Sequence, residues 1–143
     1  MNTEGGLEGR IAALEAGLRS IADRDEIDRL ITRYARAIDE DIDAEIGAIL
    51  TGDAVLEIEP WIGEPVVGRE NVVASFKDYI GKFTNRKRFV TNRHIELTGA
   101  DTATGWANWL VTMARDGQSY CGWGCYGWEF RRDGGVWAIA RMV

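Results

Sequence analysis

The chain has 143 residues, of which 45% are hydrophobic and 28% charged, a composition typical of one globular domain rather than a disordered segment. Its net charge of −6 argues against a nucleic-acid-binding protein, which needs a basic face. No apolar run approaches the ~20 residues of a membrane span. The first residues, Met1-Asn2-Thr3-Glu4, lack the basic and apolar regions of a signal peptide, so we expect a cytoplasmic protein.

The sequence predicts neither a disulfide nor a metal or nucleotide cofactor. Cys121 and Cys125 lie four positions apart in an expected strand, which separates them by roughly 13 Å and prevents a bridge, so we expect two buried free thiols. His94 is the only histidine, which excludes a metal site built from several imidazoles. The acidic run from Asp39 to Asp43 lacks the glycine and final glutamate of a calcium loop, and no glycine-rich phosphate loop occurs.

The N-terminal segment carries an apolar repeat that predicts a helix with a partner. Its apolar residues alternate in spacing between four and three, as in a short coiled-coil seam. They are Leu7, Ile11, Leu14, Leu18 and Ile21. Three heptads are too short to form a stable helix alone, so the segment must pack on the domain or on a second subunit. We expect the second subunit, which gives an oligomerising helix, 1–22, a pocket domain, 23–143, and a homodimer or homotrimer.

Helices dominate the first half of the remaining chain. Asp25 is expected to cap a second helix, with Asp28 in the position that a capping box usually gives to glutamate. The buried face of this helix is expected to comprise Ile27, Leu30, Ile31, Tyr34 and Ile38. Further elements are expected as helices at Ala44–Leu50 and Arg69–Phe83 and as strands at Ala54–Glu59 and 66–68.

Four long strands are expected in the second half, where the apolar period changes. They cover Arg88–Thr98, Thr102–Ala114, Gln118–Arg132 and Val136–Val143, joined by glycine-containing hairpin turns. Helices first and a meander last predict an α+β fold. We expect it to be cone-shaped, with a curved antiparallel or mixed sheet packed by the N-terminal helices around an apolar pocket. Glycines at 122, 124 and 127 provide places for the sheet to bend.

Four sequence blocks occur in order between Ile21 and Val143. They read Glu26-Ile27-x-x-Leu30-x-x-x-Tyr34-Ala35-x-x-x-Asp39, then Asp53-Ala54-Val55, then Asn92-x-x-Ile95-x-Leu97-x-Gly99-x-Asp101-x-Ala103, and last Gly124-x-Tyr126 with Asp133-Gly134-Gly135-x-Trp137. Together they resemble the SnoaL-like, scytalone dehydratase-like branch of the nuclear-transport-factor-two-like superfamily.

The resemblance implies a pocket rather than one reaction, since relatives include scytalone dehydratase, bile acid dehydratase, hexachlorocyclohexane dehydrochlorinase, polyketide cyclases and ketosteroid isomerase. In the dehydratases and the dehydrochlorinase, a carboxylate from the first core helix orients a histidine that removes a proton next to the leaving group. Asp39 matches that carboxylate, whereas Arg88 occupies the usual histidine position. His94 follows Asn92 by two, and strand alternation places both on the same face as Arg88. The resemblance also implies an acid or oxyanion-donor role for Tyr34.

These patterns favour a cofactor-independent lyase or isomerase acting on a small aromatic, steroid-like or polyketide-like molecule, with dehydration as the leading reaction. The expected catalytic residues are Asp39, His94, Tyr34 and Arg88, and the expected substrate-binding residues are Trp61, Asn92, Trp109, Tyr126 and Arg141. Each also has an ordinary structural interpretation, as a core aromatic or a solvated charge. Two functional alternatives stay open: a non-catalytic binding module that kept the pocket, and the small subunit of a ring-hydroxylating dioxygenase.

Overall fold

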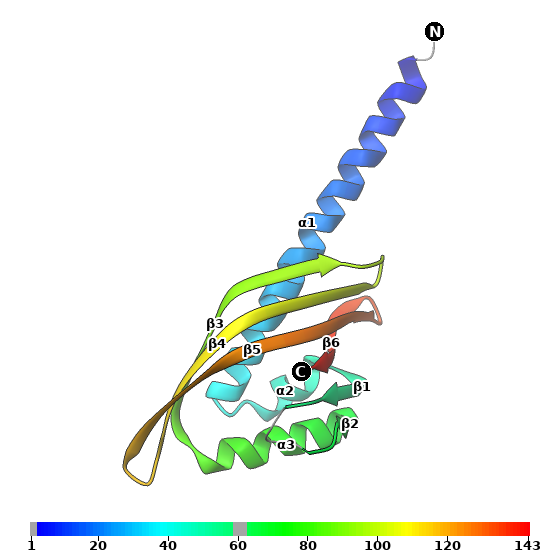
Figure 1. Cartoon of the computed structure of the whole chain (residues 1–143). Helices are drawn as coiled ribbons and strands as arrows, with labels where there is room; N and C mark the ends of the chain where they lie inside the picture. The colour runs from blue at the N-terminus through cyan, green and yellow to red at the C-terminus, as the bar shows by residue number, and fades with distance from the viewer. Residues whose placement is uncertain (1–2, 59–62) are drawn as a thin grey trace.

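The computed structural model describes residues 3–58 and 63–143, so the expected pocket residue Trp61 lies outside the described residues. In this part of the chain, two helices precede a single mixed sheet and a third lies between its second and third strands in chain order (Figure 1). The elements are α1 (Thr3–Asp39), α2 (Asp43–Ala48), β1 (Leu50–Leu56), β2 (Val66–Val67), α3 (Arg69–Lys82), β3 (Thr84–Leu97), β4 (Thr102–Arg115), β5 (Gln118–Asp133) and β6 (Val136–Met142). None of the helices in the described part of the chain combines the length and apolar character that a membrane span requires.

The sheet is curved and unclosed, with the strand order β2-β1-β6-β5-β4-β3. Strands β3 to β6 form the expected antiparallel meander, while β1 pairs in parallel with β6 and places the short β2 at the edge. The β4–β5 turn carries Asp116 and Gly117 in the left-handed region (φ 52° and 75°), as a two-residue hairpin requires. The α+β fold with a curved mixed sheet is therefore confirmed.

Helix α1 is one continuous helix, so the expected break before Asp25 is wrong. No glycine or proline lies between Ala22 and Asp39, and Asp25 forms an i,i+4 ion pair with Arg29 instead of a cap. The N-terminal half of α1 projects well beyond the sheet (Figure 1). The helix is fastened where it meets the sheet, because Asp23 accepts hydrogen bonds from Arg132 (2.6 Å) and from Trp137 Nε1 (3.0 Å).

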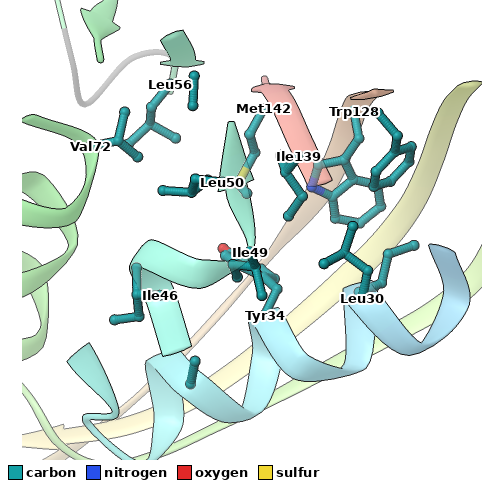
Figure 2. Close-up of a cluster of buried hydrophobic side chains, with 14 of the residues drawn as sticks. Leu30, Tyr34, Ile46, Ile49, Leu50, Leu56, Val72, Trp128, Ile139 and Met142 are labelled. Carbon is teal, nitrogen blue, oxygen red and sulfur yellow. The ribbon is translucent and has the colours of Figure 1, made fainter. Parts of the chain in front are cut away.

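The hydrophobic core lies between the C-terminal half of α1, helices α2 and α3, and the concave face of the sheet. Figure 2 shows Leu30 and Tyr34 of α1 meeting Trp128 and Ile139 of the sheet. The expected buried face of α1 is confirmed, since its five members are each at most 2% exposed: Ile27, Leu30, Ile31, Tyr34 and Ile38. This packing holds the end of α1 against the long strands.

Arg86 joins the C-terminal ends of two helices to β3. Its side chain is only 6% exposed, although its neighbours in sequence, Lys87 and Arg88, are also basic. It donates to the carbonyl oxygens of Ile38 (3.2 Å), Asp39 (3.5 Å), Ile80 (3.0 Å) and Phe83 and to the Asp41 carboxylate. The last carbonyls of a helix lack intrahelical partners and carry partial negative charge, so a guanidinium satisfies both requirements there.

Replacing Arg86 with methionine should lower the free energy of unfolding by about 3 kcal/mol, because several buried acceptors lose their donor at once. Urea denaturation followed by circular dichroism measures the loss. The matched control is Lys87→Met, since Lys87 is exposed on the opposite face of the same strand. Equal unfolding midpoints for the two variants would contradict the role assigned to Arg86.

Candidate functional site

Asp39, the last residue of α1, is held by the backbone of β3. Its Oδ2 accepts a hydrogen bond from the Arg88 backbone N–H at 2.7 Å. Its Oδ1 is buried and has no hydrogen-bond partner among the described residues. A carboxylate at a helix C-terminus is unfavourable to the helix dipole, and an unpaired buried oxygen adds a further cost. This position therefore carries an acceptor that the protein itself leaves unused.

The Arg88 side chain points inward, among aromatic rings. Its guanidinium carbon lies 5.6 Å from the centre of the Tyr34 ring and 5.9 Å from that of Tyr79, within the range of cation–π attraction. The Nε and Nη1 donors are buried and have no acceptor in the described part of the chain. Among the described ion pairs, none joins this guanidinium to Asp39, which contacts Arg88 through the main chain instead.

Arg88 keeps its charge in this setting. Burial works to lower its pKa, but the surrounding tyrosine oxygens and the Asp39 carboxylate outweigh burial and raise the pKa above its ordinary value. A permanently charged guanidinium with free donors is an unusual group to bury, because the desolvation cost is recovered only when an acceptor is present. An anionic or strongly polar oxygen is the kind of acceptor that these donors lack among the described residues.

Two tyrosines from opposite sides of the core meet beside this guanidinium. The Tyr34 hydroxyl donates to the Tyr126 hydroxyl at 3.2 Å, and the two rings are perpendicular with centres 5.7 Å apart. Burial raises the pKa of Tyr126 well above its ordinary value, so its phenol stays protonated and can act as a donor. Burial also raises the pKa of Tyr79, whose hydroxyl lies 3.4 Å from Met113 Sδ.

Trp109 covers the backbone of β5 next to Tyr126. The two ring centres are 5.8 Å apart, and the indole Nε1 donates to the Cys125 carbonyl at 3.3 Å. A Cβ on Gly124 would lie 2.7 Å from the Trp109 ring, and one on Gly122 would lie 3.4 Å from it. Glycines expected only to let the sheet bend are therefore needed here so that an aromatic ring can lie flat on the strand.

His94 does not share a face with Arg88, so the expected alternation along β3 is wrong. The pairing with β4 shifts between Thr91 and His94, and Asn92 adopts a left-handed conformation with φ 53°. This bulge inserts one residue and reverses the phase of the strand beyond it. His94 and Asn92 are therefore exposed, and the imidazole lies beside the Trp106 ring at 6.2 Å on the outer face of the sheet.

Arg141 also lies away from the Asp39–Arg88 region. Its Nη2 contacts Glu57 at 2.7 Å and its Nη1 contacts Glu129 at 3.5 Å. The hydrogen bond to Glu57 is the main cause that raises the pKa of Arg141. These residues line a surface hollow of ≈ 350 Å³. Neither Asp39 nor Arg88 lines that hollow or a second one beside Trp137.

The two cysteines are free, as expected, but exposed rather than buried. They point to the outer face because they alternate along β5 with the inward Gly122, Gly124 and Tyr126. Within residues 3–58 and 63–143, no group of three or more His, Cys, Asp or Glu side chains is arranged to hold a metal ion.

The structure thus brings together Asp39, Arg88, Tyr34 and Tyr126, with Trp109 beside the last of these. We call the first four and Tyr79 the Arg88 cluster. The sequence did not point to Tyr79, although it follows Phe76, a buried residue of α3, by three positions. In chemical terms the cluster offers one carboxylate oxygen and two cationic donors without partners among the described residues, and three phenols, two of which are hydrogen-bonded to each other.

Comparison with known families gives one assignment. A family model described as a SnoaL-like domain matches residues 19–143. No curated protein matches the sequence.

Solved structures with the same fold span most of the chain. A provisionally assigned aromatic ring hydroxylase from Novosphingobium aromaticivorans is 26% identical, with a TM-score of 0.78 over 85% of this chain and 87% of that one. A hexachlorocyclohexane dehydrochlorinase from Novosphingobium barchaimii is 21% identical, with a TM-score of 0.79 over 88% and 87%. A provisionally assigned scytalone dehydratase from Novosphingobium aromaticivorans is 17% identical, with a TM-score of 0.78 over 87% and 83%.

Replacing Gly124 with alanine should displace the Trp109 ring, because the added Cβ would overlap it. The expected loss in unfolding free energy is about 1–3 kcal/mol, with a changed near-ultraviolet circular dichroism signal. Gly127→Ala in the same strand is the control, since its nearest neighbour would be Val143 Cβ at an ordinary 3.9 Å. An unchanged near-ultraviolet spectrum for Gly124→Ala would show that the indole does not lie against this strand.

Proposed function

The chain belongs to the SnoaL-like domain family, and on this premise we propose that it is a lyase or isomerase that moves a proton on a small hydrophobic substrate, most readily by dehydration. The names of two fold neighbours, a dehydrochlorinase and a scytalone dehydratase, fit elimination chemistry. The observation that carries the proposal is the Arg88 guanidinium, which is buried among tyrosines and whose Nε and Nη1 donors have no acceptor in residues 3–58 and 63–143.

The unpaired groups are an acceptor, Asp39 Oδ1, and two cationic donors, Arg88 Nε and Nη1. Each buried Arg88 donor without a partner costs about 1–3 kcal/mol, and a substrate oxygen that accepts hydrogen bonds from these donors would recover that cost. Such an oxygen gains negative charge when a proton leaves the neighbouring carbon, and fixed donors stabilise that charge more than they stabilise the neutral carbonyl. Arg88 is therefore proposed as the group that binds and stabilises the developing oxyanion.

The proposed base is the free Oδ1 of Asp39. It takes a proton from the carbon next to the substrate carbonyl, and the C–H electron pair becomes an enolate. In dehydration the enolate electrons then form the C=C bond while the C–O bond to a β-hydroxyl breaks. A proton passes from the Tyr34–Tyr126 pair to the departing oxygen, which leaves as water. The proton on Asp39 returns to the tyrosine pair through solvent, which restores both groups.

Isomerisation needs the same parts except the departing hydroxyl. Asp39 then returns its proton to a different carbon of the enolate, and the tyrosine pair only donates hydrogen bonds. The walls of the cluster are aromatic, with Trp109 beside Tyr126, which suits a flat aromatic, steroid-like or polyketide-like skeleton. His94 has no part in this scheme because it lies on the other face of the sheet.

The oxyanion role of Arg88 can be tested with 4-nitrophenol, whose absorbance distinguishes the phenol from the phenolate. The protein should bind the phenolate more tightly than the phenol and so lower the apparent pKa of the probe. Arg88→Met should weaken phenolate binding by about tenfold or more, since a charge-assisted hydrogen bond is lost. Lys87→Met is the control and should bind like the unaltered protein; equal binding by both variants would remove Arg88 from the site.

The role of Asp39 can be tested by turnover of β-hydroxycarbonyl compounds with aromatic substituents, followed by the absorbance of the conjugated product. Asp39→Asn keeps an acceptor for the Arg88 N–H but loses the base, so turnover should fall by about 10²–10⁴-fold with the unfolding midpoint preserved. Glu40→Gln, an exposed neighbour paired with Arg36, should retain full activity. Phenolate binding without any turnover by the unaltered protein would instead favour the non-catalytic binding module.

A further inference from the structure

The N-terminal half of α1 has an apolar face against which none of the described residues packs. Five residues on this face are between 46% and 68% exposed: Leu7, Ile11, Leu14, Leu18 and Ile21. We call them the α1 seam. Large apolar side chains that are exposed together in a row mark an interaction surface more often than chance.

This half of the helix also lacks the local features that would stabilise it alone. It contains glycine at positions 6, 9 and 17, and a Cβ added at any of these three would meet no other atom within 4 Å. Glycine is among the least favourable residues in a helix interior, and no packed neighbour compensates for it here. A helix of this composition needs a partner along its length.

The α1 seam faces away from the domain to which it is attached. Leu14 and Leu30 are sixteen positions apart, which separates them by about 160° around the helix axis. Leu30 is in the core, so the seam lies on the opposite side of the helix, where Arg29 and Arg36 are also exposed. A second helix can therefore lie on the seam without touching the sheet.

We propose that the occupant of the α1 seam is the same helix of a second copy of this chain, in parallel orientation. With Ile11 and Leu18 at heptad position a, Arg10 falls at position g and Glu15 at the following position e. In a parallel pair, each g residue faces the next e residue of the other helix. Arg10 of each copy therefore faces Glu15 of the other copy, which gives two equivalent ion pairs. An antiparallel pair would bring e positions together and set glutamates against glutamates. The charges therefore complement a second parallel copy.

The full chain should be a dimer by sedimentation equilibrium, and Leu14→Glu/Leu18→Glu should raise its dissociation constant by about a hundredfold or more. The control, Ala12→Glu/Ala16→Glu, adds the same charge on the exposed opposite side of the helix and should leave the dimer intact. A monomeric unaltered protein, or an oligomer that survives the seam substitution as well as the control, would overturn the proposal. Neither measurement involves turnover, so the test of the dimer is independent of the function proposed above.

Orientation is tested by charge reversal and by crosslinking. Arg10→Glu should weaken the dimer roughly five- to tenfold, and Arg10→Glu/Glu15→Arg should restore it, because the pairs reform with exchanged signs. Ile11→Cys should give a covalent dimer on oxidation, in a background where the exposed Cys121 and Cys125 are replaced by serine. A dimer that neither recovers with the double reversal nor crosslinks through position 11 would overturn the parallel arrangement.

Discussion

The positions of Asp39 and Arg88, the two charged groups of the site, depend on the buried guanidinium of Arg86. It satisfies carbonyl oxygens at the ends of α1 and α3 while its backbone forms part of β3, so the end of α1 is fixed to the α3–β3 junction more than forty positions further along the chain. Asp39 ends α1 at this point, and Arg88 lies two residues further along β3. The hydrogen bond from the Arg88 N–H to the Asp39 carboxylate follows from that placement.

Arg86 and Arg88 are the same residue type on the same face of one strand, yet they differ in whether their donors have hydrogen-bond partners. Arg86 finds acceptors for its donors within the chain, whereas two donors of Arg88 are buried and have no partner in the part of the chain that the structure describes. A fold normally avoids such groups, and the exceptions concentrate where a ligand completes the bonding. The contrast gives Arg86 a structural role and is the basis for proposing ligand recognition by Arg88.

The periodicity of the sequence predicted most of the elements, because burial on one face is the main requirement of each, but it broke α1 before Asp25 and placed Leu50 in a helix instead of at the start of β1. The apolar face of α1 and the hairpin at Asp116-Gly117 were found to within a residue or two. The failures have local causes. The bulge at Asn92 reversed the phase of His94, and only the tolerance of asparagine for a left-handed conformation hints at it.

The site itself was predicted in part. Asp39, Arg88, Tyr34 and Tyr126 come together as the motifs implied, whereas the partner of Asp39 proved to be a backbone N–H, which no side-chain pattern can reveal. The buried position of Arg86 could have been inferred from alternation, because it shares a face with Arg88 and lies where helix ends need donors.

The central claim is that the unpaired donors of Arg88 are retained for a ligand at a cost to the fold. Urea unfolding of Arg88→Met without ligand tests it most directly. The account predicts a free energy of unfolding equal to or higher than that of the unaltered protein, because an uncompensated buried charge is replaced by an apolar side chain of similar length. A loss of several kcal/mol, as expected for a guanidinium whose bonds hold the fold together, would contradict it.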